Sequence, residues 1–181
     1  MKQRNSVTQP KDSVSSSNNF VVASVREVNN ILITMRKVVI EIIAALLVLL
    51  FLYASVSKLL AIDLFVDEMN NQPFPNWMTP WLVVLIPGSE ILISLALLFD
   101  KTRMIGFYAS LVILFLFTLY AALVLLKVFD YVPCSCGGML KKLKWDEHLL
   151  FTLGFLILSI VGIALLKKQR LAAFSDKAVR A

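Results

Sequence analysis

The sequence predicts an all-α integral membrane protein, a four-helix bundle with both termini in the cytoplasm. Apolar residues make up 59% of the 181 residues and charged residues only 17%, whereas a water-soluble domain is usually about half apolar and about a quarter charged. The apolar residues gather into four runs, each long enough to cross about 30 Å of hydrocarbon as a helix. Basic residues concentrate in the segments that this topology places on one side of the membrane.

Four apolar runs define the predicted membrane bundle, residues 38–166. The spans cover about residues 38–62, 81–99, 104–126 and 149–166. Pro87 and Gly88 lie within the second span and should loosen its helical hydrogen bonding. The runs lack the alternation of an outer-membrane barrel strand, and a lone strand would leave its backbone groups unpaired in lipid, so we expect helices.

Polar and basic segments flank this bundle. Residues 1–37 form a predicted cytoplasmic tail, in which residues 20–37 mix apolar with charged side chains, a pattern typical of an amphipathic helix on the membrane surface. Residues 167–181 form a predicted basic cytoplasmic tail. The first twenty residues are polar and contain no apolar core, so a cleaved signal peptide is not expected.

Lys and Arg residues set the predicted orientation, because basic segments resist translocation. The two tails and the connection that carries Lys101 and Arg103 hold most of them, whereas residues 63–80 have none. Residues 127–148 contain four lysines and are a partial exception. We therefore expect a multi-pass protein of the bacterial inner (cytoplasmic) membrane. The net charge of +6 is then largely a topology signal, and no nucleic-acid partner is expected.

The two cysteines, Cys134 and Cys136, lie one residue apart in the stretch YVPCSCGGML, between the third and fourth spans. This topology faces them to the periplasm, where disulfides form and persist. A disulfide across one residue would constrain little of the unfolded chain, so it would contribute little to the stability of the fold. Strained, exposed disulfides are typical of redox catalysis. Pro133 and the two following glycines favour display on a tight turn.

Two other interpretations of this pair remain open. The cysteines could be two unreactive small residues that are neighbours by chance. They could also join His148 in presenting two sulfurs and a nitrogen to Cu(I) or Zn(II), but the sequence shows no fourth ligand for a closed zinc site. We therefore predict no metal.

Charged residues within the spans form the second candidate site, because ionisable groups at membrane depth usually have a function or a partner. Glu90 lies about nine residues into the second span, and Lys58 lies near the outer end of the first. His148, the sole histidine, begins the fourth span. These three residues are predicted to line a pocket or proton relay near the cysteines. The structural alternatives are a protonated Glu90 that donates to a carbonyl group and a His148 that merely starts a helix.

The chain resembles a known family in four motifs over residues 36–166. The motifs are YASVSKLL at the end of the first span, a Pro-rich outer loop, IPGSEILISLALL in the second span, and PCSCGG before a Trp and a His that lead into the fourth. In their order and spacing they are similar to the DoxX and MauE group of four-helix membrane proteins, and more narrowly to MauE-like, redox-associated members of the Bacteroidetes type. The resemblance implies periplasmic thiol and disulfide chemistry, and its DoxX branch implies a link to quinone.

Together these observations predict an inner-membrane thiol-disulfide redox protein, in which Cys134 and Cys136 cycle between dithiol and disulfide. A periplasmic thioredoxin-like or client protein would be the partner, and a quinone could be the cofactor. The alternative is a non-enzymatic membrane subunit that anchors or assembles a periplasmic enzyme. Whether the chain forms a homo-oligomer or hetero-oligomer stays open, as does whether it is itself an enzyme.

Overall fold

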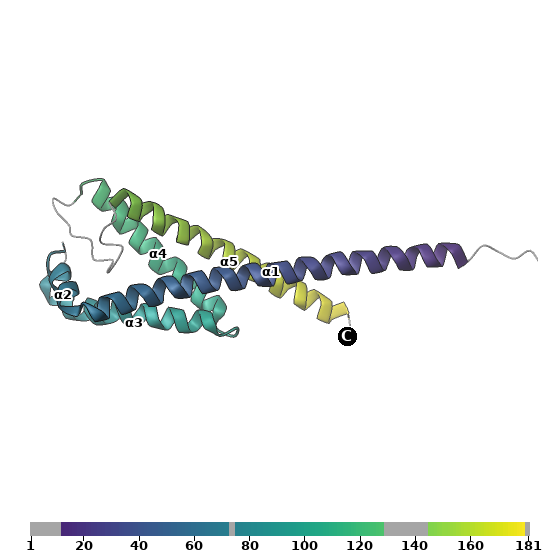
Figure 1. Ribbon diagram of the computed structural model, residues 1–181, viewed down its shortest axis with the longest axis horizontal. Coiled ribbons are helices and arrows are strands. Elements are labelled where there is room, and N and C mark those ends of the chain that lie inside the picture. Colours follow the sequence, from purple (N-terminus) through teal and green to yellow (C-terminus); the bar gives the residue numbers. More distant parts are fainter. Residues whose placement is uncertain (1–11, 73–74, 129–144, 180–181) are drawn as a thin grey trace, which may run out of the picture. The chain divides into compact units, whose positions relative to one another are not determined.

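The structure is a computed structural model that describes residues 12–72, 75–128 and 145–179. Every regular element within these ranges is helical. In chain order the elements are α1 (Asp12–Leu60), α2 (Ile62–Asn70), the 3-10 helix η1 (Asn76–Met78), α3 (Thr79–Leu98), α4 (Arg103–Leu125) and α5 (Trp145–Val179) (Figure 1). The predicted all-α fold class is confirmed.

In the described residues, four helical segments are long and apolar enough to cross a membrane. They are Asn30–Leu60, Asn76–Leu98, Arg103–Leu125 and Asp146–Ala172. The four predicted spans are therefore present, although α3 passes through Pro87 without ending. Large apolar side chains such as Leu49, Leu92 and Leu150 are exposed on the outside of the helices, as a lipid environment allows.

The chain divides into two compact units, Met1–Val38 and Val39–Ala181. The described part of the first unit is the N-terminal part of α1, in which Thr34 Oγ1 donates a hydrogen bond to the Asn30 carbonyl at 2.9 Å. The helix begins well before the predicted interfacial segment, and the placement of that segment on the membrane surface stays a prediction. The second unit contains the remaining elements and the candidate site.

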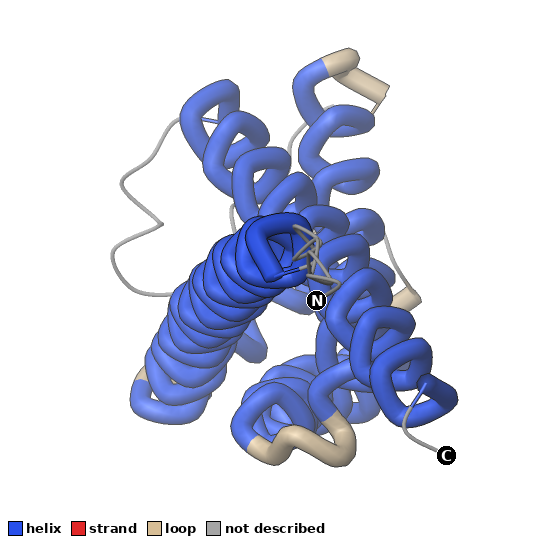
Figure 2. Tube along the Cα trace, turned by 90° about the vertical axis from the view of Figure 1, so that its right-hand side faces the viewer, coloured by secondary structure: helices blue, strands red, loops and turns tan. Residues whose placement is uncertain are grey.

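The core of the second unit is made by all four long helices, which Figure 2 shows end-on as separate coils. Each helix presents one apolar stripe at spacings of three and four residues, so its buried side chains share a face. Its buried members include Leu47 and Phe51 of α1, Leu97 of α3, Phe107 and Leu114 of α4, and Ile163 and Leu166 of α5.

Two glycines allow the helices to approach closely near the α3–α4 connection. A Cβ on Gly106 would lie 2.9 Å from the backbone nitrogen of Leu97, and one on Gly162 would lie 2.4 Å from the ring of Phe107. Small residues at such contacts are how membrane helices gain packing energy. We call this region the closed end of the bundle.

An ion pair also lies at the closed end. Arg103 Nη1 is 2.6 Å from Glu41 Oε1 of α1 and 2.9 Å from Asp100 Oδ1, and Arg103 Nε donates to the Leu97 carbonyl at 3.2 Å. The arginine therefore connects the start of α4 to α1. The side chains of Glu41 and Asp100 are 59% and 85% exposed.

At the opposite end, α2 and η1 pack against the first half of α3. Phe65 and Met69, one helical turn apart on α2, are buried against Val83. The sequence predicts a connection here, because nine residues are too few to form a span, whereas the structure contains the helix α2. At this end α4 stops in a Schellman motif: Lys127 has a φ of 54°, and the Val128 N–H donates to the Leu123 carbonyl.

Candidate functional site

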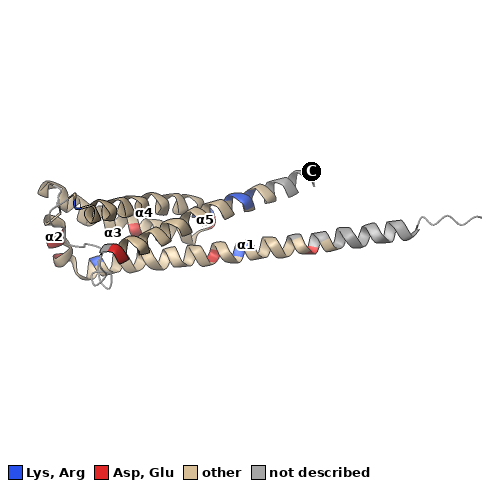
Figure 3. Cartoon of the chain, turned by 90° about the horizontal axis from the view of Figure 1, so that it is seen from above, with Lys and Arg blue, Asp and Glu red and all other residues tan. Residues whose placement is uncertain are grey.

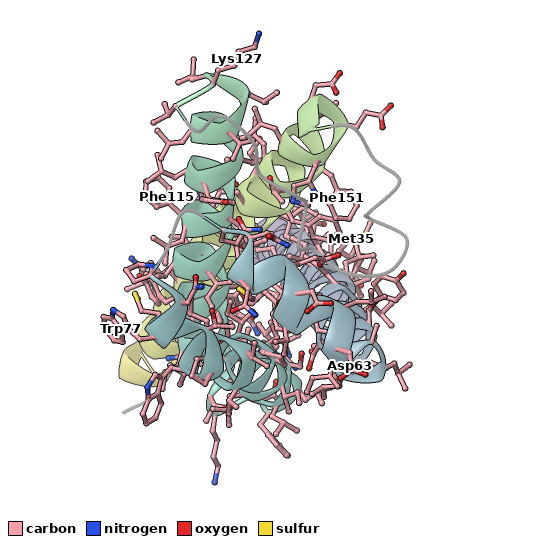
Figure 4. The ribbon with its side chains drawn as sticks, turned by 90° about the vertical axis from the view of Figure 1, so that its left-hand side faces the viewer. Met35, Asp63, Trp77, Phe115, Lys127 and Phe151 are labelled. Carbon is pink, nitrogen blue, oxygen red and sulfur yellow. The ribbon has the colours of Figure 1, made fainter. Side chains whose placement is uncertain are left out.

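A cavity of about 470 Å³ lies in the end of the bundle that contains α2, the end of α4 and the start of α5. Its walls are mostly apolar and come from all five helices, with Phe51 of α1, Met69 of α2, Ile86 of α3, Leu123 of α4 and Phe151 of α5 among them. Figure 4 views this end with α2 nearest the reader and Phe151 closer to the centre than Trp77 or Asp63. We call it the cavity end.

A buried ion pair projects into this apolar chamber. Lys58 Nζ, in the last turn of α1, lies 2.7 Å from Glu90 Oε1 of α3. The side chains are only 4% and 1% exposed, and both line the cavity. Two opposite charges at this distance offset part of each other's cost of leaving water, and removal of either one would leave an uncompensated charge in the interior.

The inward face of α3 explains why Glu90 points toward the chamber. The buried residues of α3 recur every three or four positions, and Glu90 occupies the same stripe as Val83, Pro87 and Ile93. Ser55 Oγ of α1 donates to the Pro87 carbonyl at 3.2 Å, which fixes the register of α1 against α3 one turn away from the ion pair. Ser94 Oγ donates to the Glu90 carbonyl at 2.9 Å.

The two carboxylate oxygens of Glu90 differ in their hydrogen bonding. In the part of the chain that the structure describes, Oε2 has no hydrogen-bond partner although it is buried. Lys58 Nζ donates to Glu90 Oε1 and, at 3.3 Å, to the Ala54 carbonyl. A carboxylate oxygen without a donor is costly inside a protein, so this atom needs an explanation that the described side chains do not supply.

Two further polar residues line the cavity beside α2. Tyr120 of α4 donates a hydrogen bond from its hydroxyl group to Gln72 Oε1, just beyond the end of α2. Gln72 Nε2 in turn donates to the Glu68 carbonyl at 3.1 Å. Neither residue was predicted to belong to the site, because partners 48 positions apart leave no local pattern in the sequence. The one available signal was a tyrosine inside an otherwise aliphatic span.

His148 and Thr152 complete the polar lining from α5. His148 is 4% exposed, and Thr152 Oγ1, one turn later, donates to the His148 carbonyl at 3.2 Å. Both residues line the cavity. The structure thus brings Lys58, Glu90 and His148 to one chamber, whereas Cys134 and Cys136 lie outside the described residues.

The cavity also reaches the lipid-facing surface of the bundle. Leu116 and Leu119 of α4 line it and yet are 55% and 46% exposed. The close contact of α3 and α4 is at the closed end, where Gly106 meets Leu97. Because the lining includes exposed leucines on α4, a molecule dissolved in the bilayer could reach the chamber from the side.

The charged residues differ between the two ends (Figure 3). The segments at the cavity end carry the acidic residues Asp63, Asp67, Glu68, Asp146 and Glu147, and among the described residues Lys127 follows the last turn of α4 there. The α3–α4 connection carries Lys101, and the C-terminal half of α5 carries Lys167, Lys168 and Arg170. Among the residues that the structure describes, the basic excess therefore lies toward the closed end.

Comparison with known proteins gives one result. The family model described as methylamine utilisation protein MauE matches residues 36–165. The matched range contains both cysteines, all the cavity-lining residues and the four predicted spans except residue 166. It leaves out residues 1–35 and 166–181. No curated protein and no solved structure matches the chain.

Proposed function

Because the chain belongs to the MauE family of multi-pass membrane proteins, we propose that it is a thiol-disulfide redox protein of the bacterial inner membrane. In this proposal Cys134 and Cys136 alternate between dithiol and disulfide, and they exchange with a periplasmic thioredoxin-like protein or a disulfide-containing client. The match confirms the family resemblance of the motifs, while the redox role is our inference.

The position of the cysteine pair carries the proposal. Both cysteines belong to residues 129–144, which join the end of α4 to the start of α5. The flanking helix ends contribute Tyr120, Leu123, His148 and Phe151 to the cavity. The segment that contains the two cysteine residues therefore joins two helix ends that both line the cavity.

Exchange at this pair requires no additional reactant. One thiolate attacks a sulfur of the partner's disulfide and displaces the other sulfur as a thiolate, which leaves a mixed disulfide between the two proteins. The neighbouring cysteine then attacks that bond and releases the partner. Two electrons and two protons pass from this pair to the partner, whose disulfide becomes two thiols, and the reverse reaction runs by the same steps.

The orientation follows from the basic residues. Lys101, Lys167, Lys168 and Arg170 flank the closed end of the spans, and basic segments are retained in the cytoplasm. We propose that the closed end and both termini are cytoplasmic. The cavity end, with the cysteine connection, then faces the periplasm, where an exchangeable disulfide persists.

We propose a lipid quinone as the cofactor of this cavity. The apolar walls suit a ring with an aliphatic tail, and the exposed Leu116 and Leu119 favour access from the bilayer. Lys58 can donate its third N–H to a ring oxygen, and Glu90 Oε2 can accept from a ring hydroxyl group. When bound, the quinone–hydroquinone couple would accept two electrons and two protons from the dithiol in its oxidised form, or return them to the disulfide in its reduced form. Lys58 and Glu90 would hold and orient the ring, and the apolar walls would exclude water.

An alternative function is a non-enzymatic subunit that anchors or assembles a periplasmic enzyme. Trp77 of η1 and Trp81 of α3 favour it, because they are 72% and 68% exposed at the cavity end, where aromatic residues could contact a partner. Tryptophans also anchor helices at the membrane interface, so exposure alone does not decide between the two functions.

Single and double cysteine variants distinguish these functions. With Cys134→Ser or Cys136→Ser, one thiol remains to attack while the resolving thiol is absent, so a mixed disulfide with the partner should accumulate on a non-reducing gel after acid quenching. The Cys134→Ser/Cys136→Ser protein is the matched control and should trap nothing. If neither single variant traps a partner, and both thiols stay free and inert to periplasmic thiol reagents, the redox proposal is wrong. Loss of partner capture in Trp77→Ala/Trp81→Ala alone would favour the anchoring subunit.

A further inference from the structure

We propose that the cavity binds the reduced, dihydroxy form of a lipid quinone in preference to its oxidised form, and that Glu90 Oε2 makes the distinction. This inference rests on the proposed function, which it deepens by naming the redox form that the chamber selects. It starts from one atom, the buried carboxylate oxygen that lacks a donor within the described residues.

The ion pair determines what this atom requires. The ammonium group of Lys58, 2.7 Å from Oε1, stabilises the ionised carboxyl group. Both oxygens of a carboxylate accept hydrogen bonds and neither donates. Oε1 is satisfied by Lys58, so Oε2 needs a donor from whatever occupies the cavity.

The two forms of the ring differ in this property. A hydroquinone hydroxyl group can donate to Oε2 and can also accept a hydrogen bond, because an ammonium group has three N–H donors and Lys58 uses two of them on Oε1 and the Ala54 carbonyl. A quinone carbonyl oxygen can only accept. Placed beside Oε2, it would set two acceptors against each other, and the carboxylate oxygen would stay unsatisfied.

The surroundings increase the effect of this mismatch. Glu90 is 1% exposed and the walls around it are mostly apolar, so little water is available to replace a missing donor. Leaving a buried polar group unsatisfied costs about 1–3 kcal/mol, which corresponds to an affinity ratio of roughly 5-fold to 150-fold. We therefore expect the hydroquinone to bind about 5-fold to 150-fold more tightly than the quinone.

The test measures binding, not turnover, and uses the Cys134→Ser/Cys136→Ser chain so that no thiol can react with the ligand. Anaerobic titration calorimetry of 2-decylhydroquinone and 2-decyl-1,4-benzoquinone into the protein in lipid nanodiscs gives the two dissociation constants, with empty nanodiscs correcting for partition into lipid. Tighter binding of the hydroquinone by about fivefold or more supports the proposal, and a smaller difference contradicts it. Equal affinity, tighter binding of the quinone, or no binding of either overturns it.

Glu90→Gln tests the atom itself. The amide can still accept from Lys58 through its oxygen while its NH₂ group donates toward the cavity, so the preference should disappear or invert toward the quinone. Glu41→Gln makes the same chemical change in the ion pair of the closed end and should leave the preference intact. An unchanged preference in Glu90→Gln contradicts the role of Oε2.

A ligand series covers the case in which Glu90→Gln does not fold. The dimethyl ether of 2-decylhydroquinone keeps the ring and tail but has no O–H donor, so it should bind the unaltered cavity at least about fivefold more weakly than the hydroquinone. Equal binding of the ether overturns the proposal without any change to Glu90. Because these measurements do not involve the cysteines, they can fail while the mixed-disulfide test succeeds, and the reverse.

Discussion

The two ends of the bundle differ in how far their ion pairs are shielded from water. At the closed end, Arg103 pairs with Glu41 and Asp100, whose side chains are more than half exposed, so water shares the cost of the charges. At the cavity end, Lys58 and Glu90 are both nearly inaccessible to water, and both line a mostly apolar cavity of about 470 Å³. Packing shows the same contrast, because Gly106 and Gly162 have no room for a methyl group while Gly88 and Gly154 have nothing within 4 Å.

This difference indicates which end is structural and which is functional. A membrane bundle gains stability from close contacts, as at the closed end. A chamber with a buried ion pair reduces those contacts and adds a desolvation cost, so a ligand or a reaction must account for its presence. The predictions below compare matched substitutions at the two ends, in order of decreasing effect.

Lys58→Met should have the largest effect on stability. The substitution keeps the length of the side chain but leaves the Glu90 carboxylate buried without its cation, at a cost of about 3–5 kcal/mol. Reversible unfolding in mixed detergent micelles measures the change. Lys167→Met, which removes an exposed lysine 5.6 Å above the Tyr108 ring near the other end, is the control and should change little.

A double substitution separates the charge from the packing. Lys58→Met/Glu90→Met removes both charges, so most of the stability lost in Lys58→Met should return. A Lys58→Met protein as stable as the parent, or a double variant no more stable than Lys58→Met, would contradict the buried ion pair.

Gly162→Ala should be the next most damaging change. Its Cβ would lie 2.4 Å from the Phe107 ring at the closed end, and relief of that overlap should cost about 1–3 kcal/mol. Gly154→Ala, on the same helix where the structure leaves open space, should be neutral or slightly stabilising because alanine favours a helix. Similar losses in the free energy of unfolding of the two variants would contradict the difference in packing between the ends.

Tyr120→Phe should have a smaller effect, confined to the cavity end. It deletes the hydrogen bond from α4 to Gln72 and should lower the free energy of unfolding by about 0.5–1.5 kcal/mol. Tyr108→Phe, a half-exposed position on the same helix, serves as the matched control in the same unfolding assay. A larger loss from Tyr108→Phe would argue against the attachment of α2 to α4 through Gln72.

Glu41→Gln should change stability least, by no more than about 1 kcal/mol, because its side chain is 59% exposed and Asp100 also contacts Arg103. The effect should shrink as salt is added, since exposed ion pairs are screened. A loss as large as that of Lys58→Met would show that exposure does not distinguish the two ion pairs.

Hydropathy and charge in the sequence predicted the helical class and the four spans, because both depend on local composition. Lys58 and Glu90 were predicted to share a pocket because both are ionisable at membrane depth in the outer half of their spans. The short helix α2 was missed because nine residues do not form a span. The contacts of Tyr120 with Gln72 and of Arg103 with Glu41 were missed because their partners are 48 and 62 positions apart, and only the packing of the helices brings them together.

We propose that the cavity end and the cysteine pair work as one redox unit. The most direct test is the redox state of Cys134 and Cys136 in living cells, trapped with acid and resolved by maleimide alkylation, in the parent and in Lys58→Met/Glu90→Met. We predict that the parent contains both dithiol and disulfide forms and that the variant, with an intact fold but an apolar cavity, is held in a single form. The same mixture in both proteins, or a pair that is always reduced and unreactive, would contradict the claim.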